Sequence, residues 1–130
     1  MKYLIDSDVL IDYFKGKASV RPLVERLLET DDVVAISVLS ITELRTGWTE
    51  EQAAYLLPRL AKLFTIEAVV PEIATQAGGW RHRYMKQGQP LGTVDTIIAA
   101  TAFCKQYCLV TNNTKDYPMP EVQLYKERME

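Results

Sequence analysis

The chain has 130 residues, of which 48% are hydrophobic and 25% are charged. This composition suits one compact domain, expected to span residues 1–130, and it excludes a disordered or collagen-like chain. Lysine and arginine together number 15 and aspartate and glutamate 17, so the formal net charge is −2. Because no global positive field attracts nucleic acid or an anionic membrane, a polyanionic substrate must be bound by local groups.

Cysteine and histidine are scarce. Cys104 and Cys108 are the only cysteines, which is too few for a zinc or disulfide framework, so we expect buried free thiols. His82 is the only histidine, which excludes a His-rich metal site and leaves a Ser-His-Asp triad dependent on one residue. The sequence shows no basic-then-apolar leader and no uninterrupted apolar run of about 18 residues, which predicts no membrane segment and a cytoplasmic location.

In the first half of the chain, short apolar runs alternate with segments of helical periodicity. Residues 3–5 predict a strand, and after the acidic turn at residues 6–8 the apolar spacing predicts a helix. Residues 20–28 follow the pattern of a helix with one buried face. Residues 33–36 predict a second strand, and Ser37 is placed to cap a helix that runs to about Gly47.

The same alternation continues in the second half. Thr49 and Gln52 match a capping box for a helix in which Pro58 is expected to cause a kink or a restart. A short strand at residues 65–66 precedes a helix that begins at Pro71. Further along, the pattern predicts a buried helix at 93–103, a strand at 109–110, an edge strand at 122–125 and a polar tail to residue 130.

Strands that alternate with helices predict an α/β fold in which right-handed crossovers build a parallel sheet. We expect a three-layer α/β/α sandwich with a central, mostly parallel sheet of about four to five strands. In open parallel sheets, functional sites form beyond the carboxyl ends of the strands. The residues at the strand-to-helix turns are therefore the candidates for a site.

Acidic residues mark these turns. Asp6 and Asp8 follow the first strand, and Asp116 follows the strand at residues 109–110. Glu43 lies in the helix after the second strand, and Asp95 opens the apolar helix. Because Asp6 directly follows a core strand and has no opposite charge beside it in the sequence, a site role is favoured over a turn-forming one.

The other acids each have a structural interpretation. Asp8 is most simply an N-cap or first-turn acid, and Asp95 could fill the same role for its own helix. An unpaired Asp95 in a mostly buried segment would be costly, however, so it requires a partner. A helical wheel places Glu43 in solvent, and Asp116 lies in a turn-rich loop where a turn-forming aspartate is usual.

Several carboxylates could share one site only with a cation. At a separation of about 4 Å, each like-charge pair would cost about 4 kcal/mol at an effective dielectric constant of about 20. Mg²⁺ or Mn²⁺ suits a site built from carboxylates and water, because both ions prefer oxygen ligands. Such an ion can activate water and stabilise an in-line displacement at phosphorus, so phosphodiester hydrolysis is the predicted reaction class.

Four segments together resemble a known family. In chain order they are residues 3–14 (YLIDSDVLIDYF), 40–47 (SITELRTG), 94–100 (VDTIIAA) and 109–117 (LVTNNTKDY). The set is similar to the PIN-domain ribonucleases and, within them, to the VapC-type toxins of bacterial and archaeal toxin-antitoxin pairs. The likeness covers nearly the whole chain.

The resemblance implies metal-dependent endonucleolytic cleavage of RNA by a site that holds Mg²⁺ or Mn²⁺. The metal-binding and catalytic acids that it implies are Asp6, Glu43, Asp95 and Asp116. Asp8, Thr111 and Asn113 match positions that support the site, and Tyr117 stands where phenylalanine is common. The resemblance further implies a homodimer and a small cognate antitoxin protein that blocks the acidic groove.

RNA must still be attracted to an acidic pocket. The densest basic stretch is residues 81–86, in which Arg81, Arg83 and Lys86, with Tyr84, could bind phosphates and stack a base. A solvated helix face is the simpler interpretation of these charges. Structured RNA such as tRNA or rRNA is the expected substrate.

Two other functions stay open at this point. The run DSDV after an apolar strand also resembles the nucleophile motif of haloacid-dehalogenase-like phosphatases, with Asp6 as the attacking group. That motif requires paired acids after a later strand, which residues 111–114 do not provide, and it gives Glu43 no task. The third alternative is a non-catalytic α/β binding module whose acids receive an arginine-bearing partner.

Overall fold

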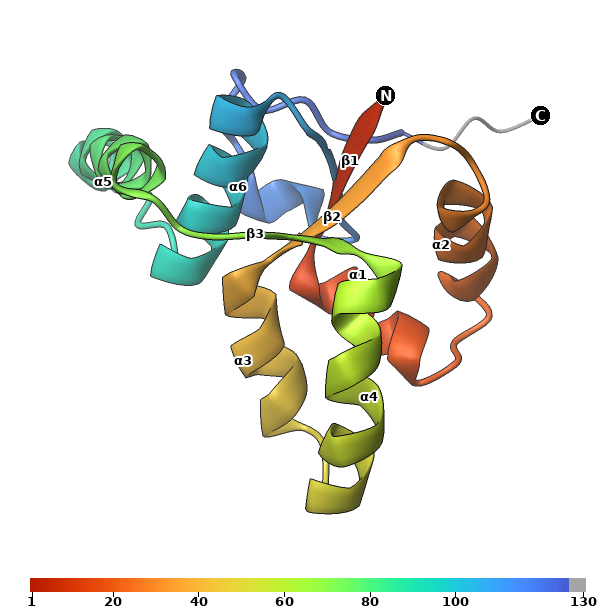
Figure 1. Cartoon of the computed structure of the whole chain (residues 1–130). Coiled ribbons are helices and arrows are strands. Elements are labelled where there is room, and N and C mark those ends of the chain that lie inside the picture. The colour runs from red at the N-terminus through yellow and green to blue at the C-terminus, as the bar shows by residue number, and fades with distance from the viewer. Residues whose placement is uncertain (127–130) are drawn as a thin grey trace.

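The computed structural model describes residues 1–126. Its centre is a four-stranded sheet in which all paired strands are parallel, in the order β3-β2-β1-β4 (Figure 1). The strands are β1 (Lys2–Ile5), β2 (Val33–Ser37), β3 (Thr65–Glu67) and β4 (Cys108–Val110). At the centre of the sheet, Leu4 pairs with Ala35 on one side and with Leu109 on the other.

Helices connect the strands and cover the sheet. They are α1 (Ser7–Phe14), α2 (Arg21–Leu28), α3 (Val38–Thr46), α4 (Glu50–Leu63), α5 (Pro71–Lys86) and α6 (Thr93–Lys105), with a 3₁₀ turn η1 at Thr114–Asp116. In Figure 1, α5 and α6 lie together on one side of the strands and α2 lies on the other. The segments predicted as helices are helical, with ends shifted by a few residues.

Alternate strand residues enter two separate cores. Leu4, Ala35 and Leu109 are fully buried and belong to a core with residues of α5 and α6. The neighbouring Ile5 and Ile36 belong to the other core, with residues of α1, α2 and α4. Because both faces are covered, the strands are apolar at nearly every position, as parallel strands usually are. The predicted three-layer α/β/α sandwich is confirmed.

Local sequence signals place several helix ends correctly. The Ser37 hydroxyl accepts a hydrogen bond from the Leu39 N–H at the start of α3. At α4, Thr49 and Gln52 form both hydrogen bonds of a capping box. These contacts satisfy N–H groups that have no partner within the helix.

The expected restart at Pro58 is wrong. Helix α4 continues from Glu50 to Leu63 with Pro58 inside it. Proline removes one backbone donor and leaves the carbonyl of residue 54 without its helical partner. Pro58 and Ala54 are both exposed, so water can hydrate that carbonyl, while buried Ala53 and Leu60 hold the helix against the core.

The end of the described chain lies beside β4. Leu109 N–H donates to the Gln123 carbonyl at 2.9 Å, and Tyr125 N–H donates to the Leu109 carbonyl at 2.8 Å. The expected edge strand is thus reduced to one parallel bridge between Leu109 and Leu124. Of the predicted polar tail, residues 127–130 lie outside the described residues. Cys104 and Cys108 are free thiols, of which only Cys108 is fully buried.

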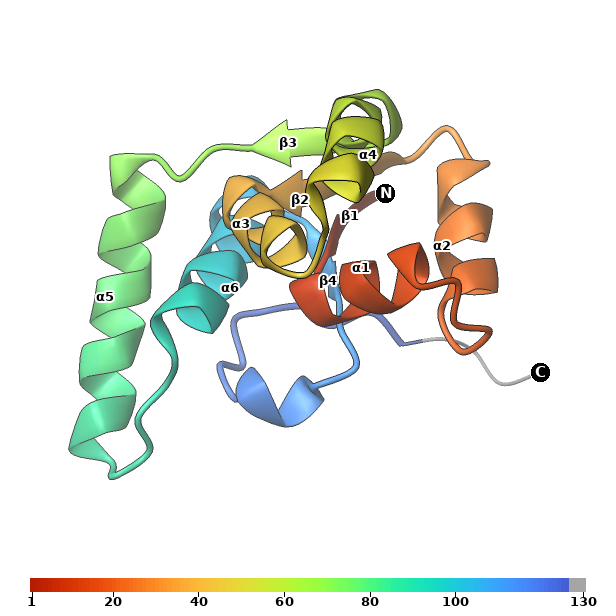
Figure 2. The same cartoon turned by 90° about the horizontal axis from the view of Figure 1, so that it is seen from below.

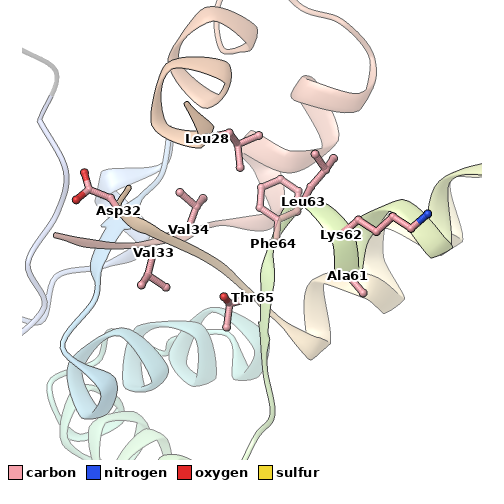
Figure 3. A pocket seen from close by; sticks show the side chains of 9 residues that line it. All are labelled: Leu28, Asp32, Val33, Val34, Ala61, Lys62, Leu63, Phe64 and Thr65. Atoms are coloured by element: carbon pink, nitrogen blue, oxygen red, sulfur yellow. The ribbon is translucent and has the colours of Figure 1, made fainter. Parts of the chain in front are cut away.

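Within residues 1–126, none of the helices has both the length and the apolar character needed to cross a membrane. One surface cavity, of about 370 Å³, lies where β2 begins and α4 runs into β3 (Figure 3). Its two charged residues, Asp32 and Lys62, lie at opposite ends of the lining in this view. Asp32 is already paired with the N-terminal amine at 3.1 Å. Because Asp32 is the one acid among the described residues that line this cavity, and the cavity lies at the amino end of β2, it is not the predicted site.

Candidate functional site

The candidate site lies at the carboxyl ends of the strands, the edge that faces the viewer in Figure 2. Asp6 follows the last residue of β1, and its N–H donates to the Val110 carbonyl of β4 at 2.9 Å. Its side chain caps α1 by accepting a hydrogen bond from the Ser7 N–H. Strand pairing and helix capping together fix Asp6 at this edge, with only 5% of the residue exposed.

The Asp6 carboxylate accepts three hydrogen bonds. Oδ1 accepts from the Ser7 N–H at 2.8 Å. Oδ2 accepts from the Thr111 hydroxyl at 2.8 Å and from the Tyr117 hydroxyl at 2.7 Å. A buried carboxylate is costly unless donors surround it, and these three donors stabilise the ionised form. These hydrogen bonds hold the Asp6 carboxylate in one orientation.

Asp8 occupies the first turn of α1, whereas Asp6 provides the N-cap. The Asp8 carboxylate accepts hydrogen bonds from the Val9 N–H at 2.8 Å and from the Asn112 N–H at 3.1 Å. Burial, followed by repulsion from Asp6, raises the pKa of Asp8 to about 6. Asp8 thus links α1 to the loop after β4.

Asp95 lies in the first turn of α6, one of the two roles considered for it, and Gly92 occupies the N-cap position. Burial is the largest of the effects that raise the pKa of Asp95, and repulsion from Asp6, Asp116 and Glu43 adds to it. The other three acids come from the junction of β1 and α1, from η1 and from α3, and the fold brings each close enough to Asp95 to affect it electrostatically. Glu43 is exposed, as the helical wheel predicted.

The donor set at this edge suits a hard cation. Among residues 1–126, no three acidic, histidine or cysteine side chains lie close enough as positioned to hold a metal ion. The repulsion that raises the pKa of Asp95 is nevertheless the kind that a divalent cation removes. Carboxylate oxygens without histidine or cysteine favour Mg²⁺ or Mn²⁺ over zinc or copper. The residues present therefore fit the ion that the sequence predicts.

The structure adds polar contacts that the sequence did not reveal. The hydroxyls of Ser7 and Ser40 form a buried hydrogen bond of 2.7 Å that joins α1 to α3, three residues before Glu43. Asn113 contributes through its backbone N–H, which donates to the Thr111 hydroxyl oxygen at 3.0 Å. Ser7 and Ser40 lie 33 residues apart and no local pattern connects them, whereas the Asn113–Thr111 contact is local, between residues two apart.

Replacing Ser40 by Ala is expected to lower the free energy of unfolding by about 1–3 kcal/mol, because the buried Ser7 hydroxyl loses its partner. Urea denaturation measures this change. Ser19→Ala is the control, since Ser19 is exposed and its replacement should stay within about 0.5 kcal/mol of wild type. Equal values for the two variants would show that the Ser7–Ser40 bond does not stabilise the fold.

The basic residues considered for RNA binding differ in their availability. The Arg83 guanidinium pairs with both carboxylate oxygens of Glu121 at 3.0 Å. Arg81 Nε donates to the Leu91 carbonyl at 3.1 Å, and Lys86 is exposed. Tyr84 is buried, with its hydroxyl directed to the Pro118 carbonyl at 3.2 Å, so it is a core residue rather than a stacking platform.

A mainly apolar groove of about 310 Å³ adjoins the acidic edge. It lies between α1, α3 and α4, and its lining residues are Ile11, Phe14, Lys15, Glu43, Leu44, Gly47, Trp48, Gln52 and Leu56. Phe14 and Trp48 pack edge to face, with ring centroids 5.5 Å apart. Glu43, one of the acids that act on Asp95, is also one of the residues that line this groove.

Comparisons with known proteins agree with this arrangement. The PIN domain family matches residues 3–121. Ribonuclease VapC10 of Mycobacterium tuberculosis is 34% identical over 118 residues, covering 91% of this chain and 87% of that protein. The tRNA(fMet)-specific endonuclease VapC of Shigella flexneri is 32% identical over 127 residues, covering 90% of each protein.

A solved structure is similar in both fold and sequence. A toxin-antitoxin complex from Klebsiella pneumoniae contains a chain with a TM-score of 0.75 and 28% identity, covering 92% of this chain and 94% of that one. The family match and the curated relatives both extend across the segments that carry the acids. The chain therefore belongs to the PIN-domain family and, within it, to the VapC ribonucleases.

Proposed function

We propose that this protein is a metal-dependent endoribonuclease and the toxin of a toxin-antitoxin pair. The observation that supports the proposal is that Asp95 interacts electrostatically with Asp6, Glu43 and Asp116 in a member of the VapC ribonucleases. Carboxylates arranged in this way serve phosphodiester hydrolysis through a divalent cation. Membership of the PIN-domain family decides against the phosphatase alternative.

Asp6 and Asp95 would hold Mg²⁺ or Mn²⁺, and Glu43 and Asp116 would complete the acidic shell. The chemistry that the bound ion supplies is activation of water for attack on phosphorus and neutralisation of the leaving oxygen. Asp6 keeps a fixed orientation because Ser7, Thr111 and Tyr117 all donate to it. The same hydrogen bonds leave only part of the Asp6 carboxylate free to contact an ion.

We propose that the substrate is a structured RNA, such as tRNA or rRNA. Support comes from the relative in Shigella flexneri, whose name describes a tRNA(fMet)-specific endonuclease. Lys86 is exposed and able to contact phosphate. Arg81 and Arg83 are also basic, but Arg81 donates to the Leu91 carbonyl and Arg83 is paired with the Glu121 carboxylate. The RNA and the free thiols favour action in the cytoplasm.

The proposed protein partner is a small antitoxin, as in the Klebsiella pneumoniae complex. The apolar groove between α1, α3 and α4 suits an apolar peptide, and Glu43 at its border suits a basic residue of that peptide. An antitoxin seated there would block access to the acidic edge. Pairing of two copies into a homodimer stays a prediction, which light scattering of the purified protein can check.

Cleavage of RNA by the purified chain, freed of any antitoxin, is the direct test. We expect cleavage with Mg²⁺ or Mn²⁺ and none when EDTA removes the ion, because water is not activated without it. Denaturing gels of total RNA measure the effect, and restored cleavage after addition of excess Mg²⁺ controls for damage by EDTA. Cleavage that persists at full rate in EDTA would contradict a metal-dependent site.

A second test addresses the toxin role. Brief induction of this chain alone should arrest bacterial growth, and mapping of RNA ends from the same cells should identify the cleaved RNA. The Asp6→Asn variant, expressed to the same level, should permit growth. Normal growth with abundant wild-type protein and no new RNA ends would favour the non-catalytic binding module.

A further inference from the structure

The hydrogen bonds on Asp6 leave little of its carboxylate available. A carboxylate offers about four lone-pair positions, two on each oxygen. On Oδ2, the Thr111 and Tyr117 hydroxyls occupy both positions, at 2.8 Å and 2.7 Å. On Oδ1, the Ser7 N–H occupies one position at 2.8 Å. One position therefore remains, and it belongs to Oδ1.

The Thr111 and Tyr117 hydroxyls are themselves held in place by neighbouring groups. The Thr111 oxygen accepts the Asn113 N–H at 3.0 Å, so its own proton is left to point at Asp6. Tyr117 is 3% exposed, and its ring belongs to the core shared with α5 and α6. Packing of the Tyr117 ring and the local Asn113–Thr111 hydrogen bond therefore keep both hydroxyls on Oδ2.

Tyr117 also lies between two of the acids. Its hydroxyl donates to Asp6, and it interacts with Asp95 on α6. The buried Tyr117 hydroxyl is therefore fixed beside the Asp6 carboxylate.

We propose that Tyr117 is a positioning residue that limits Asp6 to one coordinating oxygen and so favours Mg²⁺ over Ca²⁺. This inference rests on the proposed metal site. Mg²⁺ requires six ligands in near-octahedral geometry and keeps several waters, which a single oxygen from each carboxylate allows. Ca²⁺ takes six to eight oxygens and commonly uses both oxygens of a carboxylate. When Oδ2 is blocked, Asp6 offers a single oxygen, which suits the coordination of Mg²⁺ better than that of Ca²⁺.

The test is Tyr117→Phe, which removes only the hydroxyl and keeps the buried ring. Calorimetric titration of the metal-free protein with MgCl₂ and with CaCl₂ gives the Kd of each ion. We expect the Kd for Mg²⁺ to rise about tenfold, because loss of a group that orients a ligand typically weakens binding by about 10-fold to 100-fold. The Kd for Ca²⁺ should stay the same or fall, because Oδ2 becomes available. The ratio of the Ca²⁺ Kd to the Mg²⁺ Kd should therefore fall about tenfold or more.

Tyr84→Phe is the matched control. Tyr84 is a second buried tyrosine, and its hydroxyl donates to the Pro118 carbonyl rather than to an acid. Its loss should leave both Kd values within about twofold of wild type. Thr111→Val removes the other donor to Oδ2 and should shift the ratio in the same direction, which keeps the test available if Tyr117→Phe does not fold.

The outcomes separate this inference from the proposed function. If the wild-type protein binds neither cation, the metal site and this inference both fail. If the wild-type protein binds Mg²⁺ but the folded Tyr117→Phe and Thr111→Val variants keep the wild-type ratio, the positioning role alone is overturned. An equal loss of affinity for both ions in these variants overturns it as well, because a general structural weakening would not discriminate between the ions.

Discussion

Replacing Asp6 by Asn is expected to slow RNA cleavage about a thousandfold at saturating Mg²⁺. The amide keeps the shape of the side chain but removes the negative charge that holds the ion. Loss of the charge that holds the ion is expected to remove about 4 kcal/mol of transition-state stabilisation. This loss corresponds to a rate about a thousandfold lower. Initial cleavage rates on the RNA identified in cells measure the effect.

The fold should survive this change. The Asn oxygen can accept from the Ser7 N–H, since Asn caps helices about as well as Asp, and the amide N–H₂ can donate to the hydroxyl oxygens of Thr111 or Tyr117. Asp12→Asn is the matched control, because Asp12 also lies on α1 but pairs with Lys17 at 3.2 Å outside the site. A folded Asp6→Asn variant that cleaves at the wild-type rate would remove Asp6 from the catalytic site.

Replacing Asp95 by Asn is expected to abolish cleavage as well and, in contrast, to stabilise the metal-free protein. Asp95 has a raised pKa, so its charged form is less favourable in the folded state than in the unfolded state. This cost is present at pH values above the folded pKa and disappears as the pH falls below the unfolded pKa. The stability gained by the variant in EDTA should therefore be seen at neutral pH and vanish in acid.

With bound magnesium, we expect the wild-type protein to be more stable than the Asp95→Asn variant. At a concentration 100 times its Kd, a ligand stabilises the folded state by about 2.7 kcal/mol. If the variant binds Mg²⁺ about 100-fold more weakly, the same concentration adds only about 0.4 kcal/mol. Urea denaturation with EDTA and with Mg²⁺ measures both effects, and Asp31→Asn, an exposed acid remote from the site, is the control. Full magnesium stabilisation in Asp95→Asn would show that this carboxylate does not bind the ion.

Much of the fold was accessible from the sequence because its signals are local. The buried strands are apolar runs, and most helix starts carry a capping group or a proline within a few residues, as at Ser37, Thr49 and Pro71. The restart expected at Pro58 does not occur: proline opposes helix locally, but the packing of Ala53 and Leu60 keeps α4 continuous. Packing of that kind depends on residues that are distant in the chain.

The sequence by itself determined the layered α/β architecture and the set of acids that follow the strands, since both depend on periodicity and on order along the chain. Only the tertiary structure decided how these acids are held. Asp6 and Tyr117 are 111 residues apart, and Ser7 and Ser40 are 33 apart, yet hydrogen bonds join each pair. Parallel pairing of β1 with β4 and with β2 creates these contacts, because it aligns the carboxyl ends of strands that the sequence keeps apart.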